Sequence, residues 1–225
     1  MKLRSVFVSV AFVMFGASAL ATDDKPADKP TGQDGAMGDR DMNKMNKMTK
    51  MPKGAMNLEE WPADSRKVAE ETIAKYGAPD EATATLLTWH NNGPWKHTYL
   101  SRESTKHMFP MAHPDVVEMV IDYKVPPEKF DELAAYDGSV NVDRTRGTMS
   151  ARCDKEGANF LALNLADEII RGKKTVAQAR ADYAKNITMS MSGEMPKLMT
   201  GLQFDMQKMA AAADPDKPAT QAMGK

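Results

Sequence analysis

The stretch TATLLTWHNNGPWKHTYLS, residues 83–101, is the clearest fold signal in this chain. Threonine, leucine and aromatic residues dominate both halves, and β-branched and aromatic residues are enriched in strands. Between the halves lies Asn91-Asn92-Gly93, and an Asn-Gly pair is a strong signal for a tight hairpin turn. The stretch therefore predicts a hairpin that runs from Thr83 to Trp89 and returns from Trp95 to about Ser101.

A second hairpin is predicted to pair Ser139–Thr145 with Thr148–Cys153 across Arg146-Gly147. The glycine supplies the positive φ that such a turn requires. Successive strand residues point to opposite faces, so the register sorts the side chains into an apolar face and a polar face. The apolar face would carry Val140, Val142, Ala151 and Cys153, and the polar face Asn141, Asp143, Ser150 and Arg152.

Helices are predicted before and after the first hairpin along the sequence. Pro62–Tyr76 has apolar residues at helical spacing and ends before Gly77. Pro114–Tyr123 and Pro127–Tyr136 each begin with proline and carry apolar residues at similar spacing, so we expect two short helices there.

A last helix is expected from a cap at Thr175 to about Lys185. Together these elements predict an α+β fold, in which two β-hairpins form a small antiparallel sheet and helices pack on one face.

The N-terminus has the three parts of a bacterial signal peptide. Lys2 and Arg4 precede an apolar run, which ends in the small residues Ala19-Leu20-Ala21. The apolar run is too short to cross a bilayer. We therefore expect cleavage after Ala21, export to the periplasm or beyond the cell, and no transmembrane anchor in the mature chain.

Composition divides the remaining chain into three parts. Residues 22–57 are rich in Met, Lys, Asp and Gly and lack the large apolar residues that a core requires, so this segment is predicted to be disordered. Residues 58–187 have the mixed composition of a folded domain. Residues 188–225 are again rich in methionine, and we expect a partly helical segment, with a stripe of Leu198, Leu202, Met206 and Met209, that becomes disordered toward the end.

Charge and cysteine content exclude some classes of protein. The formal net charge is -1, which gives no reason to expect nucleic acid as a partner. The single cysteine, Cys153, rules out an intramolecular disulfide, and its simplest interpretation is a small buried apolar residue. No nucleophile motif such as Gly-x-Ser-x-Gly is present, so catalytic residues are not predicted, although a histidine-centred active site is kept as an alternative.

Most of the folded domain resembles an uncharacterised family of exported bacterial proteins. The resemblance rests on several short motifs: Gly93-Pro94-Trp95-Lys96, Phe109-Pro110, Val125-Pro126-Pro127-Glu128-Lys129-Phe130, Asp137-Gly138-Ser139, Ser150-Ala151-Arg152-Cys153-Asp154 and Asn159-Phe160-Leu161-Ala162-Leu163-Asn164. It implies export, but no activity, cofactor or active site, because the family has none assigned.

Two groups of residues are candidate metal ligands. Imidazole binds copper and zinc, and all four histidines lie within residues 90–113, with His90 and His97 on one face of the first hairpin. Thioether sulfur suits Cu(I), and 19 methionines is an unusually high content. The candidates for copper or silver are Met42, Met45, Met48, Met51, Met189, Met191, Met195 and Met199.

Each of these groups also has an ordinary structural interpretation. The histidines suit surface turns, the C-terminal methionines suit the apolar face of a helix, and the Met-Lys triplets suit a solvated repeat. A groove for a ligand or an anion is a further possibility, with Trp89, Trp95, Tyr99, Arg144 and Arg152 as its candidate residues, although hairpin aromatics also serve as packing. The sequence as a whole favours a non-catalytic binding or envelope-associated protein.

Overall fold

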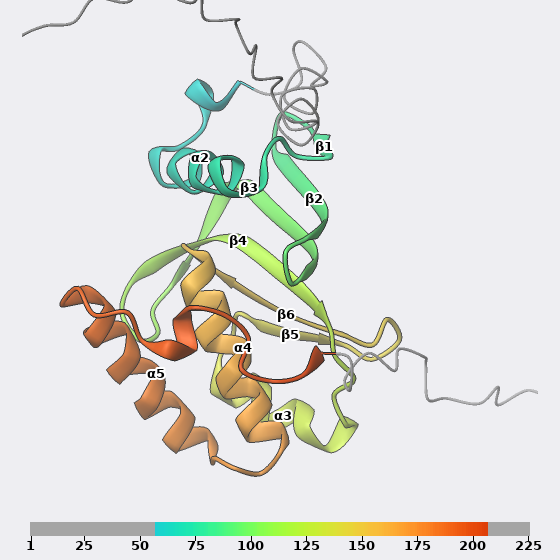
Figure 1. Cartoon of the computed structure of the whole chain (residues 1–225), viewed down its shortest axis with the longest axis vertical. Helices are drawn as coiled ribbons and strands as arrows, with labels where there is room; N and C mark the ends of the chain where they lie inside the picture. The colour runs from blue at the N-terminus through green and yellow to red at the C-terminus, as the bar shows by residue number, and fades with distance from the viewer. Residues whose placement is uncertain (1–56, 207–225) are drawn as a thin grey trace, which may run out of the picture. The chain divides into compact units, whose positions relative to one another are not determined.

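The computed structural model describes residues 57–206, which form an antiparallel sheet with helices (Figure 1). The α+β fold class is therefore confirmed. The strands are β1 (Glu81–Ala82), β2 (Leu86–Asn92), β3 (Trp95–His107), β4 (His113–Asp122), β5 (Val140–Asp143) and β6 (Thr148–Cys153), in the sheet order β1-β2-β3-β4-β6-β5. The helices are α2 (Ala63–Tyr76), α3 (Phe130–Tyr136), α4 (Glu156–Ile170) and α5 (Val176–Met191).

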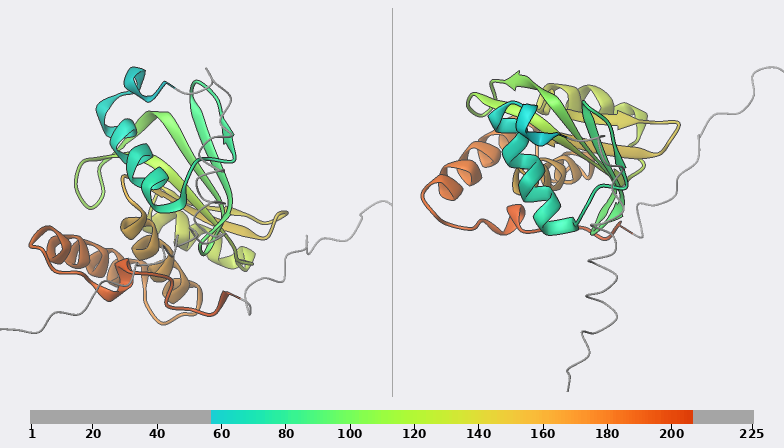
Figure 2. Two further views of the ribbon diagram at one scale, coloured as in Figure 1. Left: turned by 45° about the horizontal axis from the view of Figure 1, so that its top comes forward. Right: turned by 90° about the horizontal axis from the view of Figure 1, so that it is seen from above.

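The core lies between the sheet and the helices, and α2, α4 and α5 lie on the same side of the sheet (Figure 2). Trp95 shows how the two layers meet, because its ring stacks on Phe160 of α4 with a centroid distance of 4.7 Å. Its Nε1 donates to Glu156 Oε1 at 2.8 Å. Within residues 57–206, no helix covers the opposite face of β3, β4, β6 and β5, and polar side chains line this surface.

The first hairpin forms close to the predicted position, with a turn shifted by one residue. Asn92 pairs with Trp95, so the two turn residues are Gly93 and Pro94 rather than Asn92 and Gly93. Gly93 has a φ of 64°, in the left-handed region that residues with a side chain rarely adopt. The predicted placement of His90 and His97 on one face of the hairpin is confirmed, because these two residues pair directly.

The second hairpin has the predicted faces and the predicted second strand, but its first strand is shorter than predicted. Val140 pairs with Ala151 on the predicted apolar face, and Asn141 pairs with Ser150 on the predicted polar face. The strands are joined by residues 144–147 because Asp143 Oδ1 accepts from the backbone N–H of Arg146 at 2.8 Å and closes the turn early. Cys153 is buried, as predicted.

The helix predicted at Pro114–Tyr123 is wrong, because this segment is strand β4 in the middle of the sheet. A short apolar run does not distinguish a helix from a strand that is buried on both faces. The β-branched residues Val116, Val117, Val120 and Ile121 favour the strand, and all four are buried between the neighbours β3 and β6.

The other predicted helices are present. Helix α2 ends at Tyr76 with Gly77 as its C-cap, and the segment beginning at Pro127 is a 3-10 turn that continues into α3. Thr175 caps α5 in a capping box with Gln178, as its hydroxyl accepts from the backbone N–H of Gln178 and the Gln178 side chain accepts from that of Thr175.

The chain continues to pack against the domain beyond residue 187, where the sequence placed the start of the tail. Helix α5 runs to Met191, and a 3-10 turn at Lys197–Met199 follows it. We call residues 196–204 the C-terminal strap. The predicted helical stripe is wrong for the described residues, because the strap is irregular and packs Met199, Leu198, Leu202 and Phe204 against the core.

Within residues 57–206, no helix is long and apolar enough to cross a membrane. The predicted signal peptide, the Met-Lys repeat and the chain end after Met206 lie outside the described residues.

Candidate functional site

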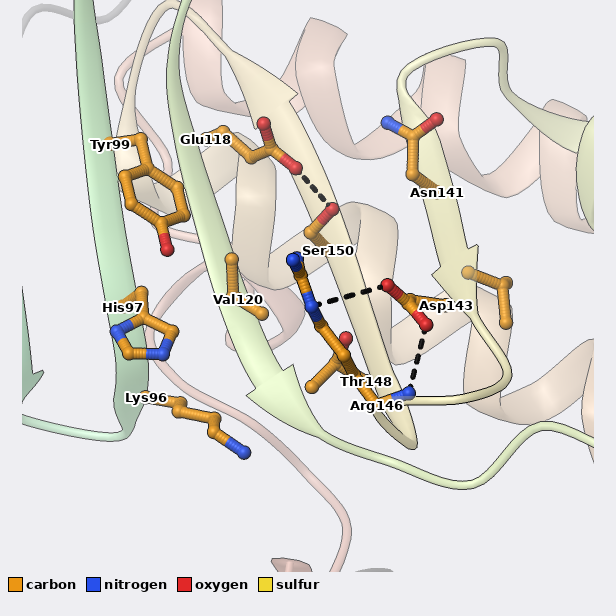
Figure 3. Close-up of a pocket in the computed structure, with 11 residues that line it drawn as sticks. Lys96, His97, Tyr99, Glu118, Val120, Asn141, Asp143, Arg146, Thr148 and Ser150 are labelled. Atoms are coloured by element: carbon orange, nitrogen blue, oxygen red, sulfur yellow. Dashed lines mark hydrogen bonds and ion pairs between the residues drawn. The ribbon is translucent and has the colours of Figure 1, made fainter. Parts of the chain in front are cut away.

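A hollow of about 740 Å³ lies on the uncovered face of the sheet. Figure 3 shows side chains from four strands converging on it, with Tyr99 and His97 on one side and Asn141 and Asp143 on the other. Glu118 of β4 lies between them. The lining residues are Lys96, His97, Tyr99, Glu118, Val120, Asn141, Val142, Asp143, Arg146, Thr148 and Ser150.

Both basic side chains of the hollow are paired with carboxylates, and Glu118 is hydrogen-bonded. Lys96 Nζ lies 2.5 Å from Asp122 Oδ1, and Arg146 Nε lies 3.5 Å from Asp143 Oδ2. Glu118 accepts a hydrogen bond from Ser150 Oγ at 2.5 Å. The lining therefore offers hydrogen-bond donors and acceptors in a setting that is close to electrically neutral.

Figure 3 also places His97 beside Tyr99, and a chain of polar contacts leads from this ring to the sheet edge. His90 Nε2 lies 2.7 Å from Glu81 Oε1, and His90 Nδ1 lies 3.0 Å from His97 Nδ1. A carboxylate accepts only, so His90 Nε2 carries the proton of the first contact. With a neutral His90, Nδ1 of His97 donates and its Nε2 is the acceptor nitrogen.

The environment of His97 favours the neutral ring. Burial lowers the pKa of His97, and the neighbouring His90 lowers it further. His97 also stacks on Tyr99 with a ring-centroid distance of 5.7 Å, which holds both rings at the rim of the hollow.

Of the predicted groove residues, only Tyr99 lines the hollow. The prediction for Trp89 and Trp95 is wrong, because each is 1 % exposed and belongs to the core. Trp89 Nε1 donates to the carbonyl oxygen of Gly77 at 2.9 Å, so its polar atom is satisfied inside the protein. These two rings pack the hairpin on the helices, as large amphipathic aromatics do when their N–H finds a partner.

The predicted arginine pair does not form an anion site in this hollow. Arg152 is directed toward Asp115, with Nε 3.7 Å from Oδ2. Arg144 is half-buried in the turn after β5 and is outside the lining, whereas its neighbour Arg146 lines the hollow in an ion pair with Asp143.

The predicted methionine ligands differ in their surroundings. Met191 and Met195 are 67 % and 74 % exposed, Met189 is half-buried, and Met199 is buried against α4. Met42, Met45, Met48 and Met51 lie outside the described residues. Soft-metal binding by these thioethers therefore stays a prediction.

Sequence reasoning missed Glu118 and Val120 because the segment that contains them was expected to be a helix. The signal that could have led to them was the polar face of the second hairpin, to which the sequence had already assigned Asn141, Asp143 and Ser150. A strand at residues 113–122 would have placed Glu118 beside that face.

Comparison of this chain with protein-family profiles, with curated proteins and with solved structures finds no match.

Proposed function

We propose that this protein is an exported, non-catalytic binding protein whose uncovered sheet face holds a small, uncharged, polyhydroxylated ligand of the saccharide class. The observation that carries the proposal is the polar hollow over β3, β4, β6 and β5. Its volume of about 740 Å³ lies in the range of small-molecule sites, roughly 300–1,000 Å³.

The charge pattern supports an uncharged ligand. A free anion would have to compete with Asp122 for Lys96 and with Asp143 for Arg146. A free cation would have to be held by Glu118, whose carboxylate already accepts from Ser150.

The mixture of polar and apolar groups supports a saccharide in particular. Sugar hydroxyls both donate and accept, and the lining supplies Asn141 and Thr148, which do both, together with the Glu118 carboxylate, which accepts. Sugars also present apolar C–H faces, and the Tyr99 ring and Val120 provide the matching surface.

The experiment is a glycan-array screen of the mature protein, followed by calorimetric titration of the saccharides that bind. Tyr99→Ala and Glu118→Gln should each weaken binding at least tenfold, because they remove the apolar surface and the central acceptor. Leu86→Ala and Glu128→Gln are the matched controls, since both residues are exposed and lie outside the lining. They should bind like the wild type. The proposal is overturned if no saccharide binds, or if all four variants retain wild-type affinity.

Soft-metal binding remains the second candidate, favoured by the high methionine content. A Cu(I) competition titration of the mature chain tests it, with Met42, Met45, Met48 and Met51 replaced by leucine in the comparison variant. Equal affinity of the two proteins would remove these four residues from the ligand set.

A further inference from the structure

A second histidine pair lies on β3 and β4, away from the hollow. His107 and His113 are direct cross-strand partners at the end of the hairpin, and Asp115 follows two residues later on β4. One donor atom from each of the three side chains lies within 4.8 Å of the other two. The hollow does not include any of these residues, so this cluster is a separate feature of the fold.

The spacing of the donor atoms matches a metal coordination sphere. Asp115 Oδ1 lies 3.3 Å from His113 Nε2 and 3.6 Å from His107 Nδ1. A tetrahedral zinc site with bonds of about 2.1 Å has ligand-to-ligand edges of roughly 3.4 Å. Both distances agree with such an edge, and the three donor atoms all lie within 4.8 Å of one another.

The hydrogen bond of His113 fixes its proton on Nδ1 and leaves Nε2 as the nitrogen that can bind an ion. Its Nδ1 lies 2.9 Å from the carbonyl oxygen of Met111, which only accepts, so Nδ1 carries the proton. This leaves Nε2 as the atom that faces Asp115. A ligating histidine usually donates its other N–H to a carbonyl or carboxylate oxygen, and this contact sets the ring orientation.

The other two candidate ligands also have polar neighbours. His107 Nε2 lies 3.7 Å from Asp137 Oδ1, which is an ion-pair distance rather than a hydrogen bond, and His107 Nδ1 lies 3.1 Å from Ser139 Oγ, a contact that a bound ion would replace. The second oxygen of Asp115 accepts from Ser139 Oγ, and Arg152 Nε lies 3.7 Å from it. Asp115 Oδ1 therefore remains for the ion, while its Oδ2 holds the carboxylate in place.

Burial makes the cluster more than a chance arrangement of surface residues. The Asp115 side chain is 2 % exposed. Asp115 Oδ1 and His113 Nε2 are both buried, and neither has a hydrogen-bond partner despite their 3.3 Å separation. Unpartnered buried polar atoms are costly and uncommon, and an ion bound between these two would satisfy both.

The backbone that presents these ligands is held in place by packing. The ring of Phe109, in the connection between β3 and β4, packs against Tyr183 with a centroid distance of 5.2 Å. The Arg180 guanidinium lies 3.8 Å from the centre of the same ring. Helix α5 therefore anchors the loop that supplies the Met111 carbonyl.

We propose that His107 Nδ1, His113 Nε2 and Asp115 Oδ1 bind a divalent transition-metal ion of the Zn²⁺ type. Imidazole and carboxylate are the donors that such ions prefer, whereas Cu(I) prefers thioethers, so this site is chemically distinct from the methionine candidates. Three protein ligands leave a fourth position for water. A cavity of about 250 Å³, lined by His113, Cys153 and Tyr183 among others, gives the ion a route of entry.

The test is a titration of the chelator-treated mature protein with Co²⁺, followed by displacement with Zn²⁺. Co²⁺ in a four-coordinate nitrogen and oxygen site gives strong visible absorption, which weak binding to methionine-rich tails does not. His113→Ala and His107→Ala should each lower Zn²⁺ affinity at least 100-fold and abolish this absorption. Asp137→Asn leaves the ligands intact but weakens the support of His107, so its affinity should fall by roughly 10- to 100-fold.

His97→Ala is the matched control, because it removes a paired histidine from the other cluster on the same strand. It should keep the wild-type affinity and absorption. Circular dichroism verifies that each variant is folded, and Asp137→Asn provides a graded effect if a ligand variant does not fold. The proposal is overturned if the wild type shows no four-coordinate Co²⁺ spectrum, or if folded His113→Ala binds Zn²⁺ as tightly as His97→Ala.

Discussion

Asn164 should be one of the most important polar residues for stability, because it attaches the C-terminal strap to α4. The residue is 3 % exposed. Its Nδ2 donates to the carbonyl oxygens of Leu198 and Gly201, each at 2.9 Å, and its Oδ1 accepts from the backbone N–H of Gln203 at 2.7 Å. Asn164→Ala removes all three bonds and leaves strap groups without partners.

The expected loss follows from these contacts. Three hydrogen bonds at about 1 kcal/mol each give about 3 kcal/mol. Alanine is a better helix former than asparagine by about 0.6 kcal/mol, which offsets part of this loss. Asn164→Ala should therefore lower the free energy of unfolding by about 2–3 kcal/mol. With a urea m-value of about 2 kcal/mol/M, the unfolding midpoint should fall by about 1–1.5 M.

Asn186→Ala is the matched control for urea unfolding. It makes the same exchange within helix α5, but its Nδ2 donates only to the carbonyl oxygen of Asp182 one turn earlier. The loss of that bond and the gain in helix propensity nearly cancel, so its free energy of unfolding should stay within about 0.5 kcal/mol of the wild type. If Asn164→Ala were no less stable than Asn186→Ala, the strap would not depend on this residue and our description of it would be wrong.

Two further predictions concern a helix cap and a titrating ring. Thr175→Ala should lower the free energy of unfolding by about 1 kcal/mol in the same assay, because it removes the cap of α5, whereas Thr188→Ala near the end of that helix should change it by less than 0.5 kcal/mol. For His97, the lowered pKa means that folding disfavours protonation. The neutral His97 ring contributes fully to the free energy of unfolding above the pKa of the unfolded state, about 6.5. This contribution is lost as the pH falls through the lower pKa of the folded state. The stability of the wild type relative to His97→Gln should therefore decrease from pH 7.5 to pH 5, and parallel curves would contradict it.

The sequence predicted those helix ends and turns that are determined by residues close to them in the chain. The cap at Thr175 and the glycine after Tyr76 act within one helical turn, so their effects can be recognised in sequence. The first hairpin was also predicted, because its turn sequence lies directly between its strands. The prediction that His90 and His97 share one face was correct, and the structure adds that they pair directly.

Strand β4 was not predicted, because its character depends on tertiary contacts. Pro114 suggested the start of a helix, but in the sheet it stands at the beginning of a strand, opposite Lys106. The apolar residues of β4 are buried on both faces of the sheet, so they lack the alternation that identifies a half-buried strand.

This one error concealed both candidate sites. Glu118 joins the polar face of the second hairpin only when β4 lies beside β6. His113 and Asp115 approach His107 only when β4 pairs with an extended β3. The residue types were visible in the sequence, but their proximity follows from strand pairing, which a helix assignment excludes.

The role of β4 also suggests how the two proposed sites are related. Glu118 and Val120 line the hollow, whereas Asp115, close to the start of the same strand, belongs to the histidine cluster. Arg152 of β6 pairs in register with Glu118 and also approaches the Asp115 carboxylate. Strand β4 therefore contributes side chains to both sites. Because Glu118 does not contact the histidine cluster directly, Glu118→Gln should leave Zn²⁺ affinity unchanged. A change in that affinity would mean that the two sites are coupled through movement of β4 and β6 rather than through shared ligands.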